Sequence, residues 1–388
     1  MFFVQVARLE DPEGAGTEPL LLVGGRSNRG VITSASYAAR EFGVRSGMPT
    51  MRALQLCPDA VVVPVPRGAC VERSRAVRAV LRKLSPVVQA ASIDEFYLDL
   101  TGTERMLGRE DLAVTADRIR RTVRETTDIA VSLGGGTQRV VAKVATRLAK
   151  PDGVHVVPPG EEAAFMTRFC LSDLPGIGPA FLRQLEAKGL HTVTDAAAVE
   201  REWLARWFGP ARGAWLWERV RGIDASEVDA SDRRKSISSE RTFFADIDDD
   251  EELERRLLKL SGSVGNQLRS RDLRARTVTV KIRDQDFRTR QAGNTMPEGV
   301  ETDRVIFAAA TSLLHRLRHR RRTGVRLLGV GLSNLVRQAP STQFDLFGER
   351  PALETERDRT IARAVDKVRD RYGRDALQPA RVLDRPER

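Results

Sequence analysis

The chain has 388 residues, of which 41% are hydrophobic and 30% are charged, which is enough for about two to four domains with hydrophobic cores. Its formal net charge of +11 favours a polyanionic partner, with an anionic membrane as the competing possibility. No apolar run of about 18 residues, no signal-peptide pattern after Met1 and no His/Cys cluster is present, so we expect a cytoplasmic protein without a membrane span or a zinc site.

The first predicted elements are short strands at 20–25 and 31–33, followed by a helical turn over 36–43. Tyr37 and Arg40 stand three residues apart in this turn, so they share one helix face. A phenol beside a guanidinium can clamp a phosphate, although such pairs are also common on ordinary helices. Helices over 50–60 and 70–84 are predicted next, and the second is basic.

Two apolar, β-rich runs flank the adjacent carboxylates Asp94 and Glu95. Neighbouring residues in a regular strand point to opposite faces, so these two acids can converge only at a bend. The pattern therefore predicts a β-hairpin with both acids at its tip. Carboxylates held together repel unless a cation lies between them, and Mg²⁺ suits an oxygen-only site that keeps room for phosphates. A solvated acidic turn is the ordinary alternative.

A helix over 112–126 and a strand over 129–133 lead to the glycines at 134–136 and to a helix that stops near Lys150. A glycine run between strand and helix can cradle a phosphate, but this spacing matches no phosphate-binding loop. Lys150 is either a phosphate contact or a solvated lysine.

The Pro-Gly-Ile-Gly turn at 175–178 lies between two predicted helices. Gly176 and Gly178 let backbone amides face outward at a helix start, where they bind DNA phosphates without reading sequence. The stretch therefore predicts a helix-hairpin-helix, with an ordinary helix–helix turn as the alternative.

Beyond a linker near 225–235, the predicted elements follow the order β-α-β-β-α-β, the split βαβ plan with two helices on one face of a four-stranded sheet. An acid-free arginine cluster lies between the second helix and the last strand, which we expect at the sheet edge. Such a run is usually solvated, but at this place it favours contact with a phosphate backbone. Its arginines are Arg316, Arg318, Arg320, Arg321, Arg322, Arg326 and Arg337.

The segment 343–347 has the sequence Gln-Phe-Asp-Leu-Phe in a loop between two prolines. Gln343 with the apolar anchors Leu346 and Phe347 fits a peptide that enters pockets on a partner protein. The alternative is a loop whose apolar residues fold back onto the chain. A basic amphipathic helix over 355–372 is predicted to follow.

Together these motifs resemble the Y-family of translesion DNA polymerases, and within it the bacterial DinB-like group. The match runs from Met1 to about residue 336. It rests on Phe2-Phe3, on 30–45 and on Ser-Ile-Asp-Glu at 92–95. Further motifs are Ala142-Lys143, the stretch 149–153 and the hairpin at 175–178. One departure is Gln138-Arg139, where the family usually has Asn-Lys.

The resemblance implies an α+β multidomain, right-hand polymerase. The palm would comprise 1–9 and 67–158, the fingers 10–66, and the thumb with the helix-hairpin-helix 159–228. The βαββαβ little finger would span 236–338, and a tail over 339–388 would carry a clamp-binding peptide and the basic helix.

The resemblance also implies the site residues. Asp94 and Glu95 would be the catalytic acids that hold Mg²⁺, two ions in all, and Phe3 would exclude a ribose 2′-hydroxyl. The triphosphate would be gripped by Tyr37, Arg40 and Lys150. Duplex DNA would be held by Gly176, Gly178 and the arginines from Arg316 to Arg326. A sliding clamp would be bound by Gln343, Leu346 and Phe347.

The reaction implied is two-metal nucleotidyl transfer from deoxynucleoside triphosphates onto primer–template DNA, by a monomer of low fidelity and poor processivity. Small residues around Tyr37 (Ala35, Ser36, Ala38 and Ala39) would form a flat roof that checks base-pair shape poorly. Two other classes stay open: a non-catalytic polymerase-like protein that binds DNA and the clamp, and a nucleotidyl cyclase, whose palm also places acids at a hairpin tip.

In the family, a palm strand carries a third metal-binding Asp, four residues before the first Phe of the Phe-Phe pair. Because Met1 directly precedes Phe2, that position would lie upstream of this chain. We therefore expect the gene to encode, in frame before Met1, a short apolar strand with an Asp three residues before Met1. If the native chain begins at Met1, catalysis should be severely impaired and the non-catalytic interpretation becomes the better one.

Overall fold

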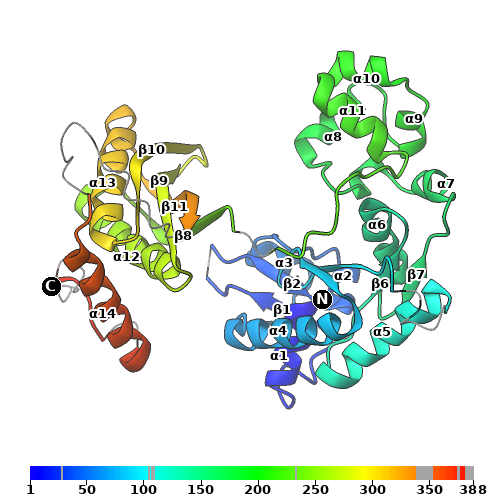
Figure 1. Ribbon diagram of the computed structural model, residues 1–388, viewed down its shortest axis with the longest axis horizontal. Coiled ribbons are helices and arrows are strands. Elements are labelled where there is room, and N and C mark those ends of the chain that lie inside the picture. Colours follow the sequence, from blue (N-terminus) through cyan, green and yellow to red (C-terminus); the bar gives the residue numbers. More distant parts are fainter. Residues whose placement is uncertain are drawn as a thin grey trace. The chain divides into compact units, whose positions relative to one another are not determined.

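The computed structural model describes residues 1–27, 29–103, 105, 110–231, 234–337, 353–373 and 376–380. The chain forms two compact units, Met1–Asp232 and Arg233–Arg388, and each is described by itself (Figure 1). Among the described helices, none combines the length and the apolar character needed to cross a membrane.

A three-stranded sheet with helices on both faces lies near the start of the first unit. Strand β1 is its centre, antiparallel to β2 and parallel to β3. Leu21 and Val23 pack against the first helix, while Leu22 packs against the helices on the other face, which explains why β1 is apolar without alternation. The elements are α1 (Phe2–Glu10), β1 (Leu21–Gly24), β2 (Ile32–Ala35), α2 (Tyr37–Glu41), α3 (Thr50–Leu56) and β3 (Val61–Val63).

The predicted acidic hairpin is confirmed. Strand β4 (Val87–Ala90) pairs antiparallel with β5 (Phe96–Asp99), and Ala90 lies opposite Phe96 across the turn. Helices α4 (Arg67–Leu84) and α5 (Leu112–Thr127) supply the core beneath the hairpin, through Val77, Leu81, Ile119 and Val123.

Strand β6 (Leu133–Gly135) pairs in parallel with β7 (Val154–Val156), so the strand predicted at 129–133 begins later than expected. Helix α6 (Arg139–Ala149) follows β6 in the sequence and packs closely against it. A Cβ atom at Gly134 would lie 2.2 Å from the carbonyl oxygen of Ala142, so only glycine allows this approach. The glycine run therefore serves strand–helix packing.

The helix-hairpin-helix is also confirmed, in the helical end of the first unit. The turn follows η1 (Leu171–Asp173) and leads into α8 (Pro179–Glu186), with Gly178 at the helix N-cap and Pro179 in the first turn. Gly176 has φ +98°, a backbone conformation that favours glycine. The remaining helices are α7 (Glu162–Met166), α9 (Val193–Ala197), α10 (Arg201–Phe208) and α11 (Pro210–Arg219).

The second unit has the predicted βαββαβ order. Its sheet runs β10-β9-β11-β8 with every neighbouring pair antiparallel, so each βαβ crossover skips one strand. The expectation that the last strand lies at the edge is wrong: β11 is interior, because it pairs with β9 on one side and with β8 on the other. The elements are β8 (Ser236–Ile247), α12 (Asp250–Arg269), β9 (Leu273–Asp284), β10 (Thr289–Val300), α13 (Asp303–Arg320) and β11 (Val325–Arg337).

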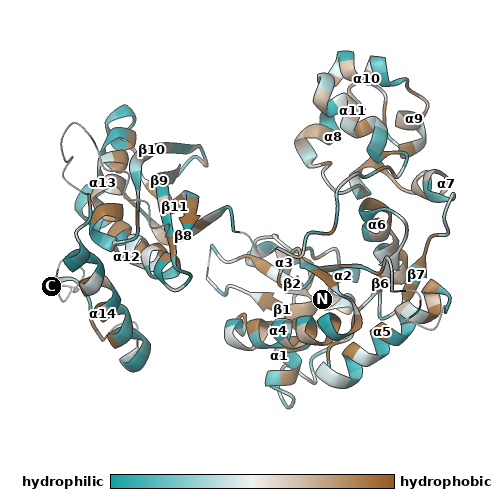
Figure 2. Cartoon of the chain, viewed as in Figure 1, coloured by the Kyte–Doolittle hydropathy of each residue, from teal (hydrophilic) through white to brown (hydrophobic). Residues whose placement is uncertain are grey.

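The predicted C-terminal helix is α14 (Glu356–Tyr372), and it is attached to this unit by charged groups. It is mostly hydrophilic (Figure 2), and its one buried residue among those described is Asp366. Asp366 accepts two hydrogen bonds from the buried Arg269 guanidinium, at 2.6 and 2.9 Å. Just before α14, the buried Glu354 carboxylate accepts from the backbone amides of Glu301 and Thr302, which anchors this segment to the residues that precede α13.

Candidate active site and DNA-binding surfaces

The tip of the β4–β5 hairpin places the two predicted acids outside the strand pairing. The amides of Ala91 and Ser92 donate to the carbonyl oxygen of Glu95 and close the turn. The Ser92 hydroxyl donates to Oδ1 of Asp94 at 2.6 Å. The acids thus lie at a fixed bend, as the strand-alternation argument requires.

Two lysines of α6 and its C-terminal end face this tip. The Lys143 ammonium pairs with the Glu95 carboxylate, and both side chains are about one-third exposed. Burial, together with the nearby charges of Lys143 and Arg40, lowers the pKa of Lys150, and Asp94 and Glu95 oppose that shift. The lysines therefore lie within electrostatic reach of both acids.

The same cations act on the amino terminus. Burial, followed by the charges of Arg40 and Lys150, lowers the pKa of the Met1 amine to about 6, while Asp94 opposes the shift. Segments far apart in the sequence thus meet here: the start of α1, α2, the acidic hairpin and the end of α6. A concentration of cationic groups around two acids suits a ligand with several negative charges.

The predicted Tyr37–Arg40 pair shares one face of α2, as expected. The Arg40 guanidinium lies 5.5 Å from the centroid of the Tyr37 ring, and its Nε donates to the carbonyl oxygen of Ala35 at 3.0 Å. Phe3 is half-buried near the start of α1 and makes an edge-to-face contact with Phe2, with ring centroids 5.6 Å apart.

Sequence reasoning did not assign site roles to Lys143 or to Arg139. Arg139 lies over the ring of Tyr97 at 4.4 Å and, with Lys143, forms an i,i+4 stripe on α6. Burial and Glu95 raise the pKa of Tyr97, whereas Arg139 opposes the shift. The stripe spacing was the signal that could have found both residues.

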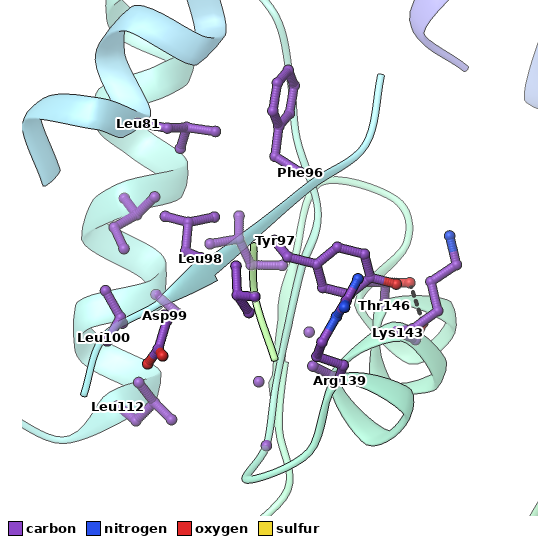
Figure 3. Close-up of a pocket in the computed structure, with 18 of the residues that line it drawn as sticks. Leu81, Phe96, Tyr97, Leu98, Asp99, Leu100, Leu112, Arg139, Lys143 and Thr146 are labelled. Carbon is purple, nitrogen blue, oxygen red and sulfur yellow. Dashed lines mark hydrogen bonds between the residues drawn. The ribbon is translucent and has the colours of Figure 1, made fainter. Parts of the chain in front are cut away.

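A cavity of about 1030 Å³ lies between β5 and β6. Both strands line it, with apolar side chains from α4 and α5 at one wall and Lys143 on α6 at the other (Figure 3). Figure 3 shows Tyr97 directed toward Arg139, and Leu98 and Leu100 on the other side of the strand. Within the described residues, β5 pairs only with β4 and β6 only with β7, so each has one edge without a strand partner.

The donor set at the hairpin tip fits one Mg²⁺ ion, since two carboxylates with room for water and phosphate oxygens suit this cation. A pair of ions normally needs a third acid as a bridge. The described part of the chain contains no cluster of three His, Cys, Asp or Glu side chains able to hold a metal. Asp99, the next acid of the hairpin, accepts from the Thr101 amide at 2.9 Å, at the opposite end of β5.

The arginines predicted to bind DNA divide into those without a described ion pair to an acid and those that pair with acids of the same unit. Arg316 and Arg320 are exposed on α13, and Arg326 lies 4.5 Å from the Phe287 ring centroid. Arg321 binds Asp284 and Asp286, and Arg322 approaches Asp250 at 3.3 Å.

Arg318 corrects the prediction. Its side chain is 3% exposed and donates to Asp250 at 2.6 Å and to the carbonyl oxygen of Asp248 at 2.7 Å. It therefore joins the C-terminal end of α13 to the start of α12 and to the end of β8, and it cannot reach a DNA phosphate. The clamp residues Gln343, Leu346 and Phe347 lie outside the described residues.

Family profiles match along most of the chain. The impB/mucB/samB family profile matches residues 1–147, the DNA polymerase-iota thumb domain 172–224, and the impB/mucB/samB C-terminal domain 234–346. A DNA polymerase IV of Desulfatibacillum aliphaticivorans is 35% identical over 383 residues, 98% of this chain and 94% of the relative. One of Caulobacter vibrioides is 35% identical over 384 residues, 98% of this chain and 92% of the relative. The chain belongs to the Y-family of DNA polymerases.

Solved structures give this Y-family member the same fold. A Y-family polymerase chimera of Dbh and Dpo4 superposes with a TM-score of 0.77 at 26% identity, covering 87% of this chain and 97% of the other. DinB from Sulfolobus solfataricus gives a TM-score of 0.58 at the same identity and coverage. The expected right-hand α+β fold and reaction class, DNA-directed DNA synthesis of the translesion type, are thereby confirmed, and the cyclase alternative is wrong. Members of the family use divalent metal ions.

Proposed function

We propose that this Y-family polymerase extends a primer at the Asp94–Glu95 hairpin, with Mg²⁺ held by these two carboxylates. The observation that carries the proposal is the meeting of Met1, Arg40, Lys143 and Lys150 with the two acids. The primer 3′-hydroxyl attacks the α-phosphorus of a deoxynucleoside triphosphate, and pyrophosphate leaves. Bound Mg²⁺ supplies Lewis-acid stabilisation of the charge on the phosphate oxygens.

The chain's own groups position the nucleotide. Lys150 and Arg40 hold the triphosphate charge with Tyr37 beside them, and a partly desolvated ammonium such as Lys150 binds phosphate more strongly than one in water. Lys143 holds Glu95 in place. The Phe3 ring would lie against the sugar of the nucleotide and leave no room for a ribose 2′-hydroxyl. Of the small residues expected to form a roof over the nascent pair, Ala35, Ser36 and Ala39 are buried, so only Ala38 beside Tyr37 is partly exposed and able to contact a base pair.

The proposed partners are primer–template DNA, deoxynucleoside triphosphates and a sliding clamp. One structural relative is described as an insertion ternary complex of Dbh DNA polymerase, at 26% identity and a TM-score of 0.61. The hairpin of Gly176 and Gly178 and the exposed arginines of α13 would bind the duplex backbone. The peptide at 343–347 would bind the clamp, and the protein would act as a cytoplasmic monomer.

We further propose that a β-strand preceding α1 occupies the cavity between β5 and β6 and brings the third metal-binding Asp. The two unpartnered strand edges and the cavity between them support this proposal, because one strand could bond to both edges. The position of the Met1 amine adds support, since it interacts with Asp94 and Lys150, which both line the cavity.

Single-nucleotide primer extension tests the function and the added strand together. The chain beginning at Met1 is compared with a chain that carries the upstream in-frame residues, and with the same extended chain in which the added Asp is Asn. We expect strong extension only from the second protein, whereas both extended chains should melt at a higher temperature than the chain from Met1. If all three bind primer–template DNA but none extends it, the non-catalytic interpretation replaces this one.

A further inference from the structure

All four tryptophans of the chain lie in α10 and α11, and each has a cation near its ring. The ring-to-cation distances run from 4.1 Å for Arg221 over Trp217 to 5.8 Å for Arg201 over the same ring. Within about 6 Å, such cations are attracted by the ring's electron-rich face. The other pairs are Arg206–Trp203, Lys188–Trp207 and Arg219–Trp215.

These rings belong to a continuous aromatic row that starts at the helix-hairpin-helix. A Cβ atom at Gly176 would lie 2.6 Å from the Trp215 ring, so the hairpin rests directly on Trp215. From there the contacts run through Phe181, Phe208 and Trp207 to Trp203, with successive centroids 5.3 to 6.3 Å apart. The row therefore joins the proposed DNA-binding hairpin to the outer end of the thumb helices.

The row ends at the surface. Phe181, Phe208, Trp207 and Trp215 are half-buried, whereas Trp203 is 46% exposed. Trp203, Arg206 and Trp207 share one face of α10 by their i, i+3 and i+4 spacing. The helix is held on another side by α11, where a Cβ atom at Gly213 would lie 2.4 Å from the Ala205 backbone nitrogen.

We infer that Trp203 and Trp207, with Arg206 and Lys188, form a stacking platform for single-stranded DNA. An unpaired base would stack on the ring face of Trp203 that Arg206 leaves open, and Arg206 and Lys188 would contact flanking phosphates. This inference rests on the proposed function, because it takes DNA as the partner. Glu202 adjoins Trp203 in the sequence, so stacking rather than net charge must supply most of the affinity.

Nucleic acid fits this surface better than an apolar protein partner. The rings are already covered in part by guanidinium and ammonium groups, which an apolar surface would have to desolvate at a cost. Phosphates instead replace the water around those cations with charge-assisted hydrogen bonds. A base also needs only a flat ring, so the platform should bind single strands with little sequence preference.

Quenching of tryptophan fluorescence by a short oligo-dT strand tests the inference on the full chain. Trp203→Leu should remove most of the quenching and weaken binding about tenfold or more, because stacking on one aromatic ring carries that much affinity. Arg206→Ala should weaken binding more than Arg201→Ala, which removes the same charge from the same helix but lies over Trp217. Trp203→Phe, which keeps a ring, should retain binding and shows that the loss is not one of folding.

Each contrary result is distinct. Unchanged affinity and quenching in Trp203→Leu overturns the inference. So does a chain with the upstream in-frame residues that extends primers without any quenching by oligo-dT. In that second case the exposed face belongs to a protein partner instead. Quenching by oligo-dT in the chain that carries the upstream in-frame residues, without primer extension by that chain, contradicts the proposed function and leaves the platform standing.

Discussion

At the scale of single residues, the hairpin acids differ in what holds them. Glu95 is paired with Lys143, while Asp94 accepts only the short Ser92 hydrogen bond among the contacts described for its side chain. The Glu95–Lys143 pair is about one-third exposed, so it contributes little stability and serves mainly to orient the carboxylate. Asp94 is the acid that a bound cation would order.

Asp94→Asn and Glu95→Gln should each lower primer extension about a hundredfold or more, because a metal-held carboxylate supplies several kcal/mol of transition-state stabilisation. The measurement is single-turnover incorporation by the chain extended with the upstream in-frame residues, in which the proposed strand would form. Asp99→Asn, on the same hairpin but bonded to Thr101, is the matched control and should keep its activity. Full activity in both tip variants would remove the hairpin from the reaction.

The lowered pKa of Lys150 predicts a pH effect on nucleotide binding. The ammonium must be protonated to hold the triphosphate, and burial brings its pKa below the ordinary 10.5. As pH rises through that lowered pKa, the ammonium loses its charge and KM for the nucleotide should rise. This rise should occur at a lower pH than for a lysine with the ordinary pKa of 10.5. Lys150→Arg should abolish the alkaline rise, because a guanidinium stays charged. The same pH profile in Lys150→Arg would show that another group titrates.

At the scale of elements, the helix-hairpin-helix depends on two glycines with different roles. Gly176 needs its positive φ and the space beside Trp215. Gly178 has an ordinary φ of −88°, and a Cβ atom at this position would have no neighbouring atom within 4 Å. Substitutions at the two positions therefore distinguish a glycine that the backbone conformation requires, Gly176, from one that it does not, Gly178.

Gly176→Ala should destabilise the protein by about 1–3 kcal/mol and weaken duplex binding, since the side chain meets both a strained backbone and a ring. Gly178→Ala should leave the melting temperature within error. Thermal unfolding and fluorescence anisotropy with labelled duplex measure the two effects. Equal melting temperatures for both variants would contradict the role assigned to Gly176.

Elements whose signals are local could be predicted from the sequence. The acidic hairpin, the helix-hairpin-helix and the βαββαβ order each follow from periodicity and turn residues. The burial of Arg318 and the interior place of β11 could not, because both depend on partners far away in the sequence, such as Asp250 and β9. The contact of Lys143 with Glu95 spans 48 residues and was missed for the same reason.

At the scale of the whole molecule, the net charge of +11 should govern DNA affinity. The affinity for duplex DNA should fall steeply between about 50 and 200 mM salt and vary little with sequence. Arg320→Ala, on the exposed end of α13, should lower the salt slope by about one. Arg318→Ala should instead lower the melting temperature, because that side chain is 3% exposed and ion-paired.

The charged attachment of α14 has a genetic consequence. A nonsense mutation just after codon 347 would spare the proposed clamp peptide yet delete Glu354 and Asp366. Arg269 would then have one fewer carboxylate partner, and the amides of Glu301 and Thr302 would lose their acceptor. Such an allele should destabilise the folded second unit, and the defect should be weaker at low temperature. It should not behave as the removal of a segment that folds independently. Truncations of the C-terminus would therefore not separate the proposed clamp binding from DNA synthesis. Missense changes within the proposed clamp peptide would be needed for that purpose.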